Sequence, residues 1–183
     1  MKNTIRTLFF ILVFAQISFS QNQKLEDLKT DLAAHSERDE ARVKILQDIV
    51  FFVSDTNVMK TYAEEAIEIA KEVNVPNLEA EILRIQAIKF AQFGNPQRGL
   101  AMIQETKKIR NTDSNSKIET AVNEARLLFQ FFGKIKEAKA VLDEARSIND
   151  ALPKDKQNTL FYNASGLVAH AFGDFEGAEK NCL

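Results

Sequence analysis

Apolar residues recur every three or four positions along most of the chain after Gln21, which is the period of an amphipathic helix. Clear examples lie at 83–91, 100–109 and 122–129. The pattern predicts helices over 23–34, 38–53, 57–73, 77–93, 96–110, 115–132, 134–149, 155–172 and 174–183. The expected fold class is therefore all-α.

Three features predict where helices begin. Ser36 is followed three residues later by Asp39, an acidic variant of the capping box. Asn95 precedes Pro96, which places a capping residue before proline at the first helical position. Ser114 follows the polar stretch 111–113 and is a third predicted cap.

The chain repeats itself with a period near 40 residues. Turn glycines at 94, 133 and 173 lie 39 and 40 residues apart. Each is followed five positions later by a small residue, Gly99, Ala138 or Ala178. An earlier copy lacks the glycine but keeps the pattern Ala63-x3-Ile67-x2-Ala70, which recurs later as Ala138-x3-Leu142-x2-Ala145. Ala63 lies 36 residues before Gly99. Two helices per unit at this period predict an α-solenoid.

The last unit resembles the tetratricopeptide repeat (TPR) family. The residues that carry the resemblance are Tyr162, Gly166, Gly173-Asp174-Phe175, Ala178 and Cys182, with departures at Ser165 and Ala169. The resemblance implies a right-handed α-α superhelix of antiparallel helix hairpins, with about four units over 38–183, the last one truncated. It also implies that Cys182 is buried between the helices of its unit.

The arrangement is also similar to the exported helical-repeat region of bacterial sensor kinases and transcription regulators. In those proteins, helices like Glu65–Lys71 follow a Phe-rich first helix. The resemblance implies a protein–protein interaction module that serves as the sensing or docking part of a larger signalling protein. The alternative is a free-standing periplasmic adaptor or assembly factor.

The N-terminus has the features of a secretory signal peptide. Lys2 and Arg6 precede an apolar run at 8–15, and small residues follow at Ser18 and Ser20, which predicts cleavage before Gln21. The run is shorter than the ~18–20 residues that span a bilayer, although a retained anchor is the alternative. Residues 1–20 are thus a predicted export signal to the periplasm, and 21–37 form an N-terminal helix or cap.

The C-terminus falls midway through the second helix of the last unit. Solenoids need a polar terminal cap to stay soluble. We therefore expect a longer native protein beyond Leu183. In that case the chain could be tethered to a membrane through a segment that lies downstream.

Composition argues against several functions. The formal net charge is −2, which gives no electrostatic reason to expect nucleic acid as a partner. One cysteine and two histidines do not make an ordinary zinc site. The glutamates at 64, 65, 68 and 72 are expected to form a solvated face. A catalytic triad is not expected at Ser165, His170 and Asp174, because these residues straddle a repeat turn and no oxyanion-hole motif accompanies them. The sequence predicts a non-enzymatic protein without cofactor or metal.

The TPR resemblance places a peptide-binding groove along the first helices of successive units. Aligned with the family pattern, the predicted groove residues in this sequence are Glu81, Arg84, Ile88, Asn123, Leu127, Gln130, Asn163, Leu167 and His170. Asparagine amides there can bond to a peptide backbone without reading its sequence; the alternative is that they simply face solvent. Because Ile88, Leu127 and Leu167 occupy positions where carboxylate-binding members carry Asn, we expect a mixed apolar and polar surface.

Overall fold

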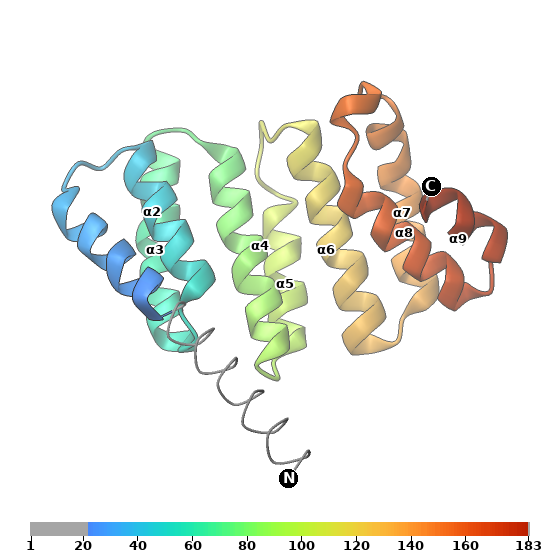
Figure 1. The fold of residues 1–183 in the computed structure, drawn as a ribbon, viewed down its shortest axis with the longest axis horizontal. Coiled ribbons are helices and arrows are strands. Elements are labelled where there is room, and N and C mark those ends of the chain that lie inside the picture. The colour runs from blue at the N-terminus through green and yellow to red at the C-terminus, as the bar shows by residue number, and fades with distance from the viewer. Residues whose placement is uncertain (1–21, 183) are drawn as a thin grey trace, which may run out of the picture.

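The structure is a computed structural model that describes residues 22–182. All regular secondary structure in this range is helical (Figure 1). A first helix covers 22–34. The elements that follow are α2 (Glu40–Phe52), α3 (Thr56–Glu72), α4 (Pro76–Gln92), α5 (Pro96–Thr106), α6 (Ser114–Phe132), α7 (Ile135–Asp150), the 3-10 helix η1 (Lys154–Lys156), α8 (Thr159–Phe172) and α9 (Phe175–Cys182). The all-α prediction is confirmed. The predicted signal at 1–20 and the predicted burial of Cys182 lie outside the described residues and side chains.

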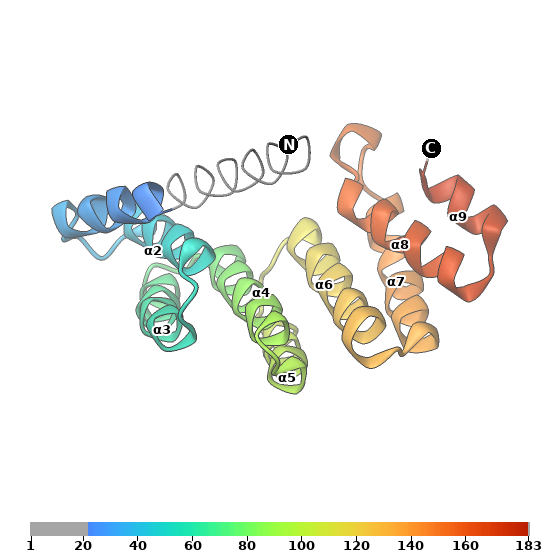
Figure 2. The same cartoon turned by 60° about the horizontal axis from the view of Figure 1, so that its bottom comes forward.

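The helices form a stack of antiparallel pairs. The most extensive contacts lie within α2–α3, α4–α5, α6–α7 and α8–α9. The first helices of successive pairs also contact one another, α2 with α4, α4 with α6 and α6 with α8. Figure 2 shows these first helices along one side of a curved stack, with α3 and α5 along the other. The described residues therefore form a superhelix of helix hairpins.

The core runs through the whole stack because each pair buries apolar residues against the next. Three clusters make it up. The first joins α2, α3 and α4, and the last joins α6, α7 and α8. Ala87, Ala91, Ile103 and Leu127 form the middle cluster, which connects the α4–α5 pair to α6. Such nearest-neighbour packing is the usual source of stability in repeat proteins.

The three turn glycines end their helices in the left-handed region. Gly94, Gly133 and Gly173 have φ angles of 89°, 64° and 88°, which side chains with a Cβ rarely adopt. The turn between α2 and α3 lacks such a glycine. Its residue Val53 has φ −65° and ψ 135°, an extended conformation open to any residue. This is why the first copy can omit the glycine.

The register predicted for the first copy is wrong by one helical turn. The residues that begin the second helices, Asp55, Asn95, Lys134 and Asp174, lie 40, 39 and 40 residues apart. Counted from these starts, Met59 occupies the position of Gly99, and Ala63 that of Ile103. Both residues of the first copy are buried, so large and small side chains exchange places there. Sequence matching aligned alanine with glycine and missed this exchange.

Two predicted helix starts move by a few residues. Asp39, not Ser36, caps α2, and its side chain accepts a hydrogen bond from the Arg42 backbone N–H at 2.9 Å. Asp113, not Ser114, caps α6. The prediction for Asn95 is confirmed, because its side chain accepts from the Arg98 N–H at 3.2 Å. The aspartates that cap α2 and α6 also complement the dipoles of these helices.

The predicted helix over 155–172 is wrong at its start. The chain forms the short η1 first, and α8 begins only after Asn158, whose side chain accepts from the Phe161 N–H at 3.1 Å. The fully buried Asn149 accepts a hydrogen bond from the Asn158 backbone N–H at 2.8 Å. This contact between α7 and the loop fixes the interruption, and no local pattern signals it.

Gly99 brings α5 into direct contact with the backbone of α4. A Cβ at this position would lie 2.4 Å from the carbonyl oxygen of Ala87. The clash would be with backbone, which cannot rotate away as a flexible side chain can. A hydrogen side chain is therefore required for this pair to pack as it does.

We expect Gly99→Ala to destabilise the protein by about 1–3 kcal/mol, because α5 must move away from α4. Thermal unfolding followed by circular dichroism measures the change. Helix propensity alone predicts the opposite sign, a gain of up to ~1 kcal/mol. A higher midpoint for the alanine variant would contradict the close approach.

Candidate functional site

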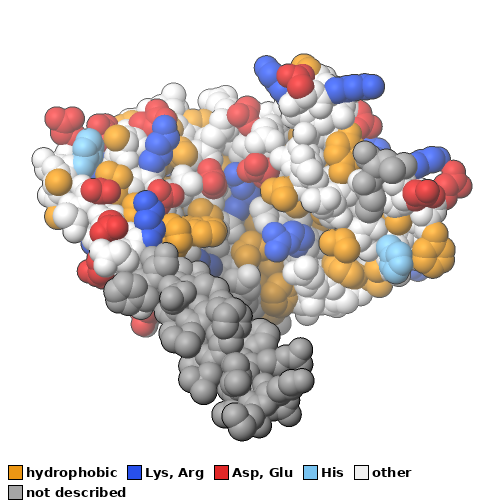
Figure 3. Space-filling view, viewed as in Figure 1, with side chains coloured by type: hydrophobic (Ala, Val, Ile, Leu, Met, Phe, Trp, Pro, Cys, Tyr) orange, Lys and Arg blue, Asp and Glu red, His pale blue; other side chains and the backbone are white. Residues whose placement is uncertain are grey.

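Three first helices, α4, α6 and α8, enclose a groove of about 450 Å³. The view in Figure 3 shows acidic, basic and apolar side chains interspersed on this face. The groove is lined by Glu81, Arg84, Ile85, Glu119, Val122, Asn123, Arg126, Phe129, Gln130, Leu160, Asn163, Ala164, Leu167 and Val168. These residues come from one face of each helix, at spacings of three and four.

The structure places six of the nine predicted groove residues on its walls: Glu81, Arg84, Asn123, Gln130, Asn163 and Leu167. Three do not line it. Leu127 is fully buried in the cluster that joins α5 to α6, and Ile88 packs against that cluster. The His170 ring lies instead against Phe175, with ring centroids 5.4 Å apart.

Sequence reasoning missed several lining residues, and among them Glu119, Arg126 and Leu160 matter most for the chemistry of the groove. The family register selects only three positions on each helix. A signal for Glu119 and Arg126 was nevertheless present, because they lie four and three residues from Asn123 on the same face of α6. Leu160 stood inside a helix whose start was mispredicted.

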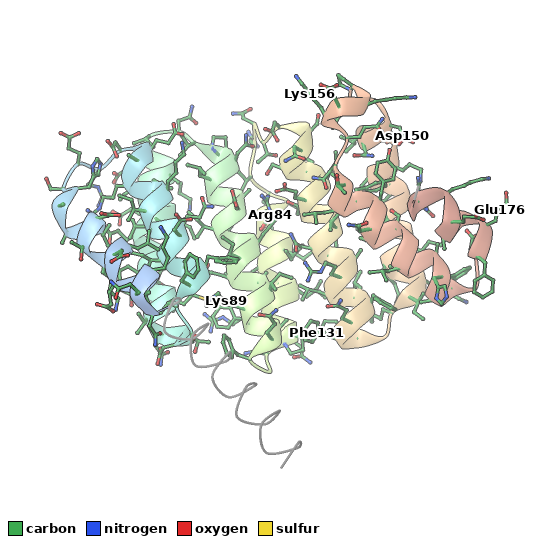
Figure 4. The ribbon with its side chains drawn as sticks, viewed as in Figure 1. Arg84, Lys89, Phe131, Asp150, Lys156 and Glu176 are labelled. Atoms are coloured by element: carbon green, nitrogen blue, oxygen red, sulfur yellow. The ribbon has the colours of Figure 1, made fainter. Side chains whose placement is uncertain are left out.

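Arg84 connects α4 to α6 and is the most buried charge in the groove. Its Nη2 donates to Glu119 Oε2 at 2.8 Å, and its Nη1 donates to Ser116 Oγ at 2.9 Å. Only 4% of the residue is exposed, and this burial lowers the pKa of the guanidinium while Glu119 opposes the shift. Figure 4 shows Arg84 at the centre of the stack. Arg84 therefore joins the α4–α5 pair to the α6–α7 pair, and its guanidinium is already bound to Glu119 and Ser116.

Glu81 lies one helical turn before Arg84 on the same wall. Burial raises the pKa of its carboxyl above the ordinary value of 4.5. Arg84 lowers this pKa, whereas Glu119 and Asp48 raise it further. A carboxylate at this position is therefore poorly solvated and incompletely neutralised by the protein itself.

Amide groups contribute the uncharged polar part of the groove. Asn123 donates its Nδ2 hydrogen to the Glu119 backbone carbonyl at 3.0 Å, which leaves its Oδ1 as an acceptor. Gln130 and Asn163 are exposed. Amides of this kind can accept from and donate to a peptide backbone.

The α8 wall is apolar and exposed. Leu160 is 57% exposed and Leu167 is 61% exposed, and the two lie about two helical turns apart on the face that lines the groove. These two large apolar side chains give the rim of the hollow an apolar surface on the α8 side. The groove thus combines an apolar wall with a polar and charged one.

A second exposed apolar surface follows the turns within the pairs. Phe51, Phe93, Phe131 and Phe172 lie at or next to the ends of the first helices and are 38–59% exposed. We call these four residues the phenylalanine edge; Figure 4 shows Phe131 on the lower side of the stack.

The glutamates of α3 lie on a largely solvated face, as expected, because Glu64, Glu68 and Glu72 are exposed, but three of the four also form ion pairs with α2 and the residues just before it. Glu65 pairs with Arg42 of α2, with Nη2 and Oε1 2.6 Å apart. Arg38 pairs with Glu72 at 2.9 Å and with Glu68 at 3.3 Å. These contacts fasten the start of α2 to α3, so the acidic stripe has a structural role.

The other candidate chemistry does not assemble. The Asp174 side chain accepts from the Gly177 N–H at 2.8 Å and caps α9. Within the described residues, the buried Ser165 hydroxyl has no hydrogen-bond partner, and no hydrogen bond joins it to His170 or Asp174. In the same part of the chain, no group of three His, Cys, Asp or Glu side chains is arranged to hold a metal ion. None of the helices described in 22–182 is long and apolar enough to span a bilayer.

Comparison with known proteins places the fold. A putative kinesin light chain with nearly identical TPR-like repeats from Podosopora anserina superposes with a TM-score of 0.62 at 14% identity, over 91% of this chain and 86% of that one. BtubC (BKLC) from P. vanneervenii gives a TM-score of 0.42 at 16% identity, over 88% and 85%. No protein-family profile matches the chain, and no curated protein matches its sequence. The fold is a TPR-like helical-repeat superhelix, as the sequence predicted.

Replacing Arg84 by Gln should destabilise the protein by about 2–4 kcal/mol, because Glu119 and Ser116 then lose a partner inside the α4–α6 contact. Denaturant unfolding measures the loss. The control is Lys180→Gln, which breaks the exposed pair with Glu176 and should change stability by less than ~0.5 kcal/mol. Equal small effects of both changes would contradict the structural role of Arg84.

Glu81→Gln should stabilise the free protein at neutral pH. The pKa of Glu81 is raised in the folded state, so its favourable contribution exists below pH 4.5 and is lost as the pH rises through the folded pKa. The variant removes the poorly solvated charge, and its advantage should therefore disappear as the pH falls towards 4.5. Thermal unfolding from pH 4 to pH 8 tests this. An advantage that is constant with pH would contradict it.

Proposed function

We propose that the chain is an exported protein–protein interaction module that binds a peptide segment of its partner in the groove between α4, α6 and α8. The observation that carries the proposal is the pair of exposed leucines, Leu160 and Leu167, facing polar residues across a hollow of about 450 Å³. Apolar side chains held in this way lose little entropy on binding because their helices are already packed.

The size and chemistry of the groove support a peptide ligand. A hollow of about 450 Å³ accommodates a few side chains and falls in the range of small-ligand sites. Amides at Asn123, Gln130 and Asn163 can bond to an extended backbone, while Leu160 and Leu167 can bury an apolar side chain. The mechanism is recognition without a bond-making step.

We further propose that the module is the sensing or docking part of a larger bacterial signalling protein. The basic and apolar start of the chain and the resemblance to exported repeat regions of sensor proteins support this role. A free-standing periplasmic adaptor is the alternative. Fractionation of source cells with an antibody to the repeats distinguishes them: a large membrane-associated protein favours the sensor, and a soluble periplasmic protein of about 18 kDa favours the adaptor.

Leu167→Ser and Leu160→Ser should each weaken binding of selected peptides by about 10-fold to 100-fold, because each removes about 1.5–3 kcal/mol of apolar burial. The probes are peptides selected from a random phage-displayed library on residues 21–183. Fluorescence anisotropy with the synthesised peptides measures their affinity.

Phe175→Ser is the matched control, since Phe175 is 67% exposed but lies outside the groove. It should leave affinity within about twofold of the parent. A library that yields no peptide, or peptides that bind all three variants equally, would contradict the proposed groove.

A further inference from the structure

Four charged side chains line the groove, and two of them neutralise each other. Arg84 and Glu119 form an ion pair, with Nη2 and Oε2 2.8 Å apart. Glu81 and Arg126 complete the set. Within residues 22–182, neither of these two forms an ion pair or a side-chain hydrogen bond, so the groove presents one carboxylate and one guanidinium to a ligand.

The Arg84–Glu119 pair fixes how far apart these two charges lie. The contacting helices α4 and α6 run side by side in the same direction (Figure 1). Glu81 precedes Arg84 by three residues, about 4.5 Å along α4, and Arg126 follows Glu119 by seven residues, about 10.5 Å along α6. The backbone positions of Glu81 and Arg126 are therefore offset by ~15 Å along the groove, a distance that four or five extended residues span.

Apolar residues occupy the interval between the two charges. Ile85 and Val122 lie on the α4 and α6 walls between the levels of Glu81 and Arg126. Leu160 and Leu167 face them from α8. A ligand that meets both charges therefore passes over these apolar side chains and can bury an apolar side chain of its own between them.

We propose that the groove selects an extended peptide with a basic side chain at Glu81, an acidic side chain at Arg126 four or five residues away, and an apolar side chain between them. This inference rests on the proposed peptide-binding function of the same groove. It goes beyond that function because it names the charge pattern of the partner.

The electrostatics of the free groove favour this ligand. Burial leaves the Glu81 carboxylate poorly solvated, and Glu119 and Asp48 add repulsion. A bound ammonium or guanidinium supplies the missing opposite charge, and charge-assisted hydrogen bonds of this kind are stronger than neutral ones. Arg126 is exposed, so it can meet a carboxylate without first leaving another partner.

Charge reversal of the groove tests the pattern regardless of the direction in which the peptide runs. Peptides selected on the parent protein should carry one basic and one acidic residue four or five positions apart. Glu81→Lys should instead select peptides with two acidic residues, and Arg126→Glu peptides with two basic residues. Replacing either charged residue of a selected peptide by Gln should weaken its binding about fivefold to tenfold.

The control changes reverse charge outside the groove. Glu176→Lys and Lys180→Glu alter an exposed ion pair of α9 and should leave the selected pattern unchanged. Glu81→Gln provides a conservative second variant, which should lose the preference for a basic residue while its fold becomes more stable. A reduced preference accompanied by lower stability would indicate damage to the fold and would overturn this assignment.

The outcomes separate this inference from the proposed function. Selected peptides that lose affinity with Leu167→Ser, but carry no paired charges and ignore both reversals, would overturn the charge pattern and leave the groove intact. Failure of the library to yield any peptide would overturn both. Selection of paired charges that follow the two reversals would establish the assignment.

Discussion

The close approach of the two helices in the pairs α4–α5, α6–α7 and α8–α9 is the constraint on which the rest of the structure depends. Gly99 shows it most directly, because a single added carbon would meet the backbone oxygen of Ala87. Ala138 and Ala178 stand at the same position in later pairs and are buried. Because the helices of a pair pack closely, successive pairs stack at a nearly constant spacing. This regular stacking places the first helices of the pairs side by side on one surface.

That surface becomes a groove because α4, α6 and α8 contribute matching faces. The Arg84–Glu119 pair joins the first two of these helices and sets their relative level. The same pair also neutralises two charges of the groove, so the charged side chains left available to the proposed ligand are Glu81 and Arg126. A structural contact thus determines which side chains are available for recognition.

Two features of the groove work against the stability of the free protein. Glu81 holds a charge where burial disfavours it, and Leu160 and Leu167 expose apolar surface to water. Neither feature is explained by packing within the described residues, and the ligand proposed above, with its opposite charge and apolar side chain, would relieve both. Binding sites commonly contain groups that lower the stability of the free protein, such as a buried charge or exposed apolar side chains.

The sequence alone determined the fold class, the helix pairs and the repeat, because helical period and turn glycines are local properties that recur along the chain. It also placed six groove residues, such as Asn123 and Leu167, through the register of a resemblance. Only the tertiary structure decided that Leu127 is core, that Arg84 is engaged by Glu119, and that Met59 replaces the small residue of the first pair. It also set the start of α8, through the buried Asn149. Each of these outcomes depends on contacts between residues at least nine positions apart in sequence, and no local pattern records which neighbour a side chain meets.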